Sequence, residues 1–287
     1  MMLDNFWKLK APWQKIESQD ALLYQLKISE HVSNILYQPE TLSPLETEHP
    51  QIKIHNKSFT NVSFSKTTIS KTIFVNCIFT KCLFIGTKFI SCKFSECQFK
   101  YINTWNIEFI DTYIDPYTLR SAIPNGEYSN IGIELYQSLF RNLKNIYQPE
   151  LLRSAEYYFL VWNRKHKFQK FIKSKKIIYL IDYLSLWLQQ LIGYGVRFRW
   201  LFFTLICLFS SACVFNYFYW ESFEIKPDTP KSLANVIFYT FYTVASYGST
   251  PWSPSSTRGI ISAITQGVVG WTSLGVGIAM IIKRLVR

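Results

Sequence analysis

The sequence lacks the residue patterns on which most enzymes and metal proteins depend. It has six cysteines but no Cys-x-x-Cys pair, and its histidines are too scattered to join them in a zinc site. No nucleophile elbow or phosphate-binding loop accompanies the histidines either. We therefore expect no enzymatic activity, no resident cofactor and no structural metal, and we expect the thiols to be free and buried. The histidines are His31, His49, His55 and His166.

Acidic residues are scarce relative to basic ones. The chain of 287 residues has 31 lysines and arginines against 19 aspartates and glutamates, which gives a formal net charge of +12. Such an excess suits nucleic acid, but it also suits the cytoplasmic side of a membrane protein. The first twenty residues contain no apolar core of signal-peptide length, so we expect the front of the chain to stay in the cytoplasm.

A repeat of five residues fills positions 57–114. Every fifth residue is large and apolar from Phe59 to Phe99, and after Thr104 the series resumes at Phe109. A period of five fits neither a helix nor a flat strand. A coil with a corner every five residues instead buries this column of large side chains together with a second column of smaller ones. A smaller column lies two residues before each large side chain: Val62, Thr67, Thr72, Cys77, Cys82, Thr87, Cys92 and Cys97.

This pattern resembles the pentapeptide-repeat family. The resemblance implies a right-handed quadrilateral β-helix over residues 51–115, in which Cys77 and Cys97 stack one coil apart as core filling. Residues 51–114 carry eight lysines against three acidic residues, which argues against the DNA mimicry of some members. DNA binding by the basic face stays open as a minor alternative. We expect a docking surface or spacer for an unknown cytoplasmic ligand or protein, with no nucleic acid.

The segments around the repeat read as helical. Residues 18–37 have apolar positions at helical spacing after a Ser18 cap, and we assign residues 1–50 to a helical cap over the open edge of the repeat. Residues 116–176 form a helical linker with helices at about 131–147 and 150–173. Seven of the thirteen residues in 164–176 are lysine or arginine, which suits the anionic headgroups of membrane lipids.

An apolar and aromatic segment follows at residues 177–196. It contains Asp182 and has basic residues on both flanks, so each end prefers the cytoplasmic side. We interpret it as an amphipathic helix lying at the membrane interface. Its Gly-Tyr-Gly at 193–195 resembles a filter but directly precedes arginines, and we interpret it as a flexible break before the next segment.

Two long uncharged runs predict membrane spans in a pore domain at 197–287. The runs are 200–220 and 260–282, each of bilayer length. Basic residues precede the first run and follow the second, which predicts cytoplasmic termini. Between them, residues 232–243 predict a helix capped by Ser232 and too short to cross. A Tyr-Gly pair and a return rich in proline then indicate a re-entrant loop.

The order span, short helix, Tyr-Gly and span resembles the two-span potassium-channel family. The whole arrangement is similar to a bacterial group that fuses pentapeptide repeats to such a channel. The resemblance implies a homotetramer in the bacterial inner membrane with a permeant monovalent cation, potassium or sodium. It also implies a filter at 244–248 after the pore helix, and Gly270 as a candidate gating hinge, with ordinary small-residue packing as the alternative. The filter residues are Thr243, Val244, Ala245, Ser246, Tyr247 and Gly248.

The filter departs from the family pattern at two positions. Val244 replaces a threonine hydroxyl, and Ser246 replaces a glycine whose backbone angles are costly for other residues. We therefore expect weak potassium selectivity. The alternative is a non-conducting, membrane-tethered scaffold in which the repeat binds a partner. A soluble nucleic-acid binder leaves both long apolar runs unexplained.

Overall fold

The computed structural model describes residues 4–44, 50–124, 128–191, 193–195, 197–226, 229–246 and 252–285. The chain divides into an N-terminal unit, Met1–Trp187, and a C-terminal unit, Leu188–Arg287. Parallel sheets, the helices α1–α4 and most of α5 form the N-terminal unit. The C-terminal unit is helical, and two of its helices are long and apolar enough to cross a membrane.

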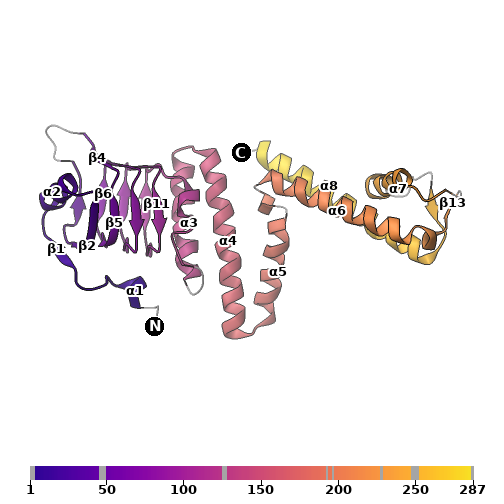
Figure 1. Ribbon diagram of the computed structural model, residues 1–287, viewed down its shortest axis with the longest axis horizontal. Coiled ribbons are helices and arrows are strands. Elements are labelled where there is room, and N and C mark those ends of the chain that lie inside the picture. Colours follow the sequence, from indigo (N-terminus) through magenta and orange to yellow (C-terminus); the bar gives the residue numbers. More distant parts are fainter. Residues whose placement is uncertain are drawn as a thin grey trace. The chain divides into compact units, whose positions relative to one another are not determined.

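The N-terminal unit contains three parallel sheets (Figure 1). The first joins β1 (Gln14–Ile16), β2 (His31–Tyr37), β5 (Ser58–Ser63), β8 (Ile78–Thr80) and β11 (Gln98–Lys100). The second joins β4 (Ile52–His55), β7 (Thr72–Val75) and β10 (Lys93–Ser95). The third joins β3 (Thr41–Leu42), β6 (Thr68–Ser70), β9 (Lys88–Ile90) and β12 (Glu108–Ile110).

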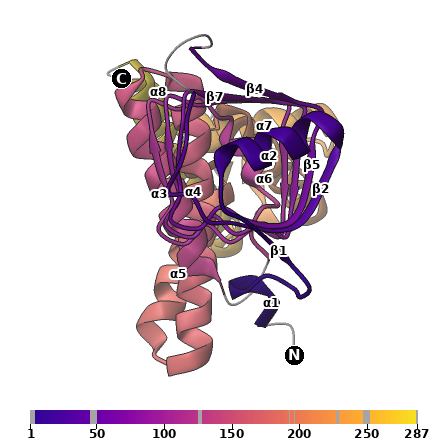
Figure 2. The ribbon, with the colours of Figure 1, turned by 90° about the vertical axis from the view of Figure 1, so that its left-hand side faces the viewer.

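The chain returns to the same sheet after four segments of five residues. Phe59 pairs with Phe79, and Phe79 with Phe99, so the register advances by twenty residues. Isolated bridges join Ser63, Leu83 and Asn103 at the same interval. The phenyl rings of this column stack with centroids 4.9 and 5.1 Å apart. Figure 2 looks along the stack of strands, which surround a common interior. Both predicted inward columns are buried.

The period of five has a backbone cause. Every fifth residue has a left-handed backbone, with φ between 47° and 66°. This conformation costs about 1–2 kcal/mol for a residue with a Cβ, and burial of the large side chain that follows in each segment offsets it with about 2 kcal/mol. The corner residues are Asn56, Asn61, Lys66, Lys71, Asn76, Lys81, Gly86, Ser91, Glu96, Tyr101, Asn106 and Asp111.

The small inward column supplies hydrogen-bond donors. The thiol of Cys82 lies 3.5 Å from the carbonyls of Phe59 and Thr80, and Cys77, Cys92 and Cys97 repeat the arrangement. The Thr87 hydroxyl donates to the Phe64 carbonyl over 2.6 Å. Burial raises the pKa of Cys82 to about 12, which keeps this thiol protonated and unreactive. All six cysteines are free, as predicted. Four are buried, whereas Cys207 is exposed and Cys213 is partly buried.

Strands replace part of the predicted helical cap. Helix α2 (Gln19–Ile28) begins as predicted, with the Ala21 amide donating to the Ser18 hydroxyl over 3.2 Å. The helical prediction is wrong beyond Ile28, because Ile35 and Leu36 belong to β2. Strand β2 pairs with β5, and its Val32 and Ile35 are buried. Strands β1 to β3 therefore extend the sheets. Near the start, α1 (Asp4–Trp7) leads to a segment whose Lys10 amide donates to Asn61.

A helix closes the other end of the sheets. After η1 (Pro116–Leu119), α3 (Ser129–Asn145) and α4 (Pro149–Ser174) form the predicted pair, with bounds shifted by one or two residues. The Asn142 side chain accepts from the Thr112 amide over 3.0 Å and donates to the Thr112 carbonyl over 2.6 Å. Asn142 thus satisfies the backbone groups that a further strand would otherwise bond.

Replacing Asn142 tests this closing contact. Asn142→Leu keeps the size of the side chain but leaves a buried amide and a buried carbonyl of Thr112 unpaired. We expect a loss of about 2–4 kcal/mol of unfolding free energy. Asn145→Leu on the exposed end of α3 is the control. Thermal unfolding of the detergent-solubilised protein, followed by circular dichroism, measures both variants. Equal midpoints for the two would contradict the capping role.

The C-terminal unit begins within α5 (Ile177–Leu191) and continues through η2 (Gly193–Gly195) to α6 (Phe198–Tyr219). The predicted break at Gly-Tyr-Gly is confirmed, with Gly193 and Tyr194 both left-handed. Next come η3 (Glu221–Phe223), β13 (Ile225–Lys226), α7 (Leu233–Ser246), β14 (Ser253–Pro254) and α8 (Thr257–Leu285). Helices α6 and α8 contain the two predicted spans.

Candidate pore segment

Helix α7 is an apolar helix too short to cross a bilayer. Its fourteen residues reach about 21 Å at about 1.5 Å per residue, short of a hydrocarbon core of about 30 Å. The predicted Ser232 cap is confirmed, because the Asn235 amide donates to its hydroxyl over 3.2 Å. One face of the helix is buried, and it consists of Val236, Tyr239, Thr240 and Thr243.

Hydrogen bonds connect α7 to both candidate spans. Asn216 of α6 donates to the Thr240 hydroxyl over 2.8 Å and to the Gln266 carbonyl oxygen over 3.0 Å. Gln266 of α8 donates back to Asn216 over 2.8 Å and to Ser262 over 2.9 Å. Asn216 and Thr240 are fully buried. Three helices therefore meet at one polar cluster, which the sequence analysis missed.

The predicted filter begins inside α7. The sequence analysis ends the short helix at residue 243, whereas the structure continues it to Ser246. That boundary is wrong by three residues, and Val244, Ala245 and Ser246 have helical backbone here. The residues explain the extension, because no glycine or proline interrupts the apolar run before Gly248. Tyr247 and Gly248 lie outside the described residues. Thr243 is buried, and its hydroxyl donates to the Tyr239 carbonyl over 2.7 Å.

Gly270 lies where α8 meets the end of α7. A Cβ atom at this position would stand 2.1 Å from the Val244 carbonyl oxygen and 2.8 Å from its Cγ1 atom. Only a glycine permits this approach. Helix α8 continues through Gly270, and its role as a hinge stays a prediction. Gly275, one and a half turns further on, has no atom within 4 Å of the position a Cβ would take.

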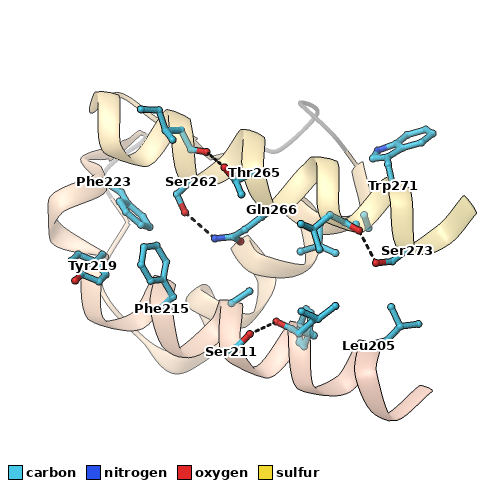
Figure 3. Close-up of a pocket in the computed structure, with 18 of the residues that line it drawn as sticks. Leu205, Ser211, Phe215, Tyr219, Phe223, Ser262, Thr265, Gln266, Trp271 and Ser273 are labelled. Carbon is cyan, nitrogen blue, oxygen red and sulfur yellow. Dashed lines mark hydrogen bonds between the residues drawn. The ribbon is translucent and has the colours of Figure 1, made fainter. Parts of the chain in front are cut away.

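A cavity of about 1110 Å³ lies between α6 and α8 (Figure 3). Apolar side chains of α6, among them Leu205, Phe215 and Tyr219, form one wall. Helix α8 contributes polar side chains along one stripe, at helical spacing: Arg258, Ser262, Thr265, Gln266 and Ser273. The hydroxyls of Thr265 and Ser273 donate to carbonyls of their own helix over 2.8 and 2.7 Å.

A second surface of interest lies on α4 and α5 within the N-terminal unit. Lys167 pairs with Asp182 over 2.6 Å, which turns one face of α5 toward α4. The opposite face exposes Ile177, Ile181, Leu184 and Trp187, spaced as neighbours on one side of a helix. The amphipathic character predicted for 177–196 is present, but the helix ends at Leu191.

Comparison with protein-family models and with curated proteins finds no match for this chain. The functional assignment therefore depends on the residues and contacts described above. Among the residues that the structure describes, no three histidine, cysteine or acidic side chains lie together as metal ligands would.

A pair of glycine substitutions tests the close contact of α7 and α8. Gly270→Ala forces a methyl group against the Val244 carbonyl, and we expect it to lower the unfolding free energy by about 1–3 kcal/mol. Gly275→Ala is the control on the same helix, because its methyl group meets open space. Alanine also favours a helix over glycine, so the control should be neutral or slightly stabilising. Near-ultraviolet circular dichroism during heating in detergent measures both. A control as damaging as Gly270→Ala would refute the contact.

Proposed function

We propose that the chain is one subunit of a homotetrameric cation channel of potassium-channel-like architecture. The proposal rests on the length and the attachment of helix α7. It is an apolar helix of less than bilayer length, attached to two candidate spans by buried hydrogen bonds and followed by Tyr-Gly. A chain that enters lipid and returns on the same side needs protein or water around its irregular backbone. A shared aqueous axis supplies both.

In the proposed tetramer, the segment 243–248 lines the ion path with backbone carbonyls. Such carbonyls replace the hydration shell of a permeant cation. Val244, Ala245 and Ser246 must leave the last turn of α7 to do so, because helical carbonyls point along the helix axis. Ser246 stands where a glycine would give the most freedom, so the filter is degenerate and passes potassium and sodium with weak discrimination.

The polar stripe of α8 supports the same arrangement. Ser262, Thr265 and Ser273 lie on one side of a helix that is otherwise apolar at membrane depth. A hydroxyl that faces lipid finds no further hydrogen-bond partner there, whereas a hydroxyl beside water or another protein chain does. In the proposed assembly this side of α8 faces α6 and the cavity between the two helices, so its hydroxyls lie beside protein or water.

The N-terminal unit acts as a cytoplasmic sensor or docking surface in this proposal. Its register of twenty residues and its corners every five residues support a right-handed quadrilateral β-helix of the pentapeptide-repeat kind. The exposed apolar face of α5 lies at the inner leaflet of the bacterial inner membrane, and the neighbouring lysines of 164–176 contact anionic headgroups. A cytoplasmic ligand or protein on the repeat then biases the gate.

One observation favours the alternative of a membrane-tethered scaffold. Helical backbone through Ser246 shortens the loop that is left for a filter. In that case the C-terminal unit anchors and assembles the chain, while the repeat binds a partner and no ions pass.

Recordings from planar lipid bilayers separate the two functions. We expect the purified tetramer to give single-channel currents, and Tyr247→Ala to abolish them. Tyr24→Ala, which changes an exposed tyrosine of α2, is the matched control and should leave the currents intact. With sodium opposite potassium, the reversal potential should fall short of that of a strict potassium electrode. A folded but silent tetramer would reject the channel and support the scaffold.

A further inference from the structure

The amides of Asn216 and Gln266 form a reciprocal pair inside the C-terminal unit. Each side-chain nitrogen donates to the other side-chain oxygen, over 3.0 and 2.8 Å. The second hydrogen of Asn216 goes to Thr240 over 2.8 Å, and the second hydrogen of Gln266 goes to Ser262 over 2.9 Å. We call Asn216, Thr240, Ser262 and Gln266 the amide clamp. All four amide hydrogens of the pair are thereby used.

The clamp contacts α7 through a single side chain with a fixed orientation. Thr240 donates its hydroxyl hydrogen to the Val236 carbonyl over 2.7 Å, so its oxygen serves as an acceptor for Asn216. A hydrogen bond is directional, unlike an apolar contact, and at membrane depth its polar groups have few other partners. The clamp therefore selects one rotation of α7 about its axis and one depth between α6 and α8.

A second contact lies one turn further along both helices. Thr240 and Val244 are four residues apart on α7, as are Gln266 and Gly270 on α8. Val244 touches α8 at Gly270, one turn beyond the point where Thr240 accepts from Asn216 of α6. Gly270 sets how closely the helices approach, whereas the clamp sets their rotation and depth. In the helical form both contacts position the end of α7, and the clamp stays in place when Val244 leaves the helix.

We propose that Asn216, Thr240 and Gln266 are positioning residues that fix α7 and, through it, the ion-selective segment. The effect on ions rests on the proposed function, but the effect on α7 does not. Apolar residues of similar size would fill the same space and keep the spans packed. Such replacements should leave the fold and the assembly in place and release only the orientation of α7.

Hydrogen exchange of the full chain in lipid nanodiscs tests the positioning directly. We expect Asn216→Leu to raise amide exchange in residues 233–246 by about tenfold, since the three hydrogen bonds of Asn216 are lost, including the one to Thr240 of α7. Ser211→Ala is the control on α6, because the Ser211 hydroxyl donates only to the Leu208 carbonyl of its own helix in the described contacts. Its exchange pattern should match the unaltered chain. Gln266→Met provides a second route if Asn216→Leu fails to fold.

An exchanged pair distinguishes a specific clamp from general packing. The double variant Asn216→Gln with Gln266→Asn keeps both amides and the summed length of the two side chains. We expect it to restore most of the protection that Asn216→Leu removes. Unchanged exchange in both Asn216→Leu and Gln266→Met overturns the proposal, and so does an exchanged pair that is no better than the leucine variant.

Bilayer recordings then test whether the position of α7 affects the selectivity between potassium and sodium. With sodium opposite potassium, the reversal potential of Asn216→Leu should move toward zero, while a purely structural loss would reduce the number of channels and leave that potential unchanged. Raised exchange with an unchanged potential overturns the role in selectivity. Raised exchange in a chain that never conducts rejects the channel and retains the clamp as the device that positions α7.

Discussion

A backbone amide or carbonyl that is removed from water needs a hydrogen-bond partner, and this requirement governs both units of the chain. In the N-terminal unit, parallel ladders satisfy the strands, and the inward thiols and hydroxyls donate to carbonyls beside the corners. Where the ladder ends, the Asn142 side chain supplies the missing partners. The choice of cysteine and threonine in the small column follows from this need, because alanine would fit the space but donate nothing.

In the C-terminal unit the same requirement makes the end of α7 the critical segment. The helix ends at Ser246, so the carbonyls of its last turn, those of Val244, Ala245 and Ser246, have no partner within the helix. As a filter, it must present them to water or to a cation, which a single chain in lipid does not provide. The two functions weighed above therefore differ in what these three carbonyls meet: water and a cation on a shared axis, or groups that cap the end of a helix. Four copies around one axis favour the unwound form, and a solitary chain favours the helix.

The sequence predicted those features whose cause is local. The period of five fixes the corner and both inward columns, and each is found where the repeat places it. The spans follow from uncharged length, and the caps at Ser18 and Ser232 follow from side chains two or three residues from the amides they bind. The helical prediction failed at Ile35 because alternating and helical spacing agree over a few residues, and only pairing with β5 decides between them.

Contacts between distant helices were not predictable in the same way. Asn216 and Gln266 are fifty residues apart, and a single amide in an apolar run gives no sign of its partner. The sequence gives one indication of this contact: each residue carries a polar amide inside a candidate span, where an amide without a hydrogen-bond partner costs free energy. Val244 and Gly270 are likewise joined only by the fold.

The clamp bears on how the filter proposed above is held in place. A glycine-rich filter adopts its geometry with little backbone strain, whereas Val244 and Ser246 resist it. The surrounding helices must then supply more of the positioning, and the hydrogen bond from Asn216 to Thr240, one turn before Val244, does so. If the clamp positions α7 in this way, ion selectivity depends on the side-chain amides of α6 and α8 as much as on the identity of the filter residues.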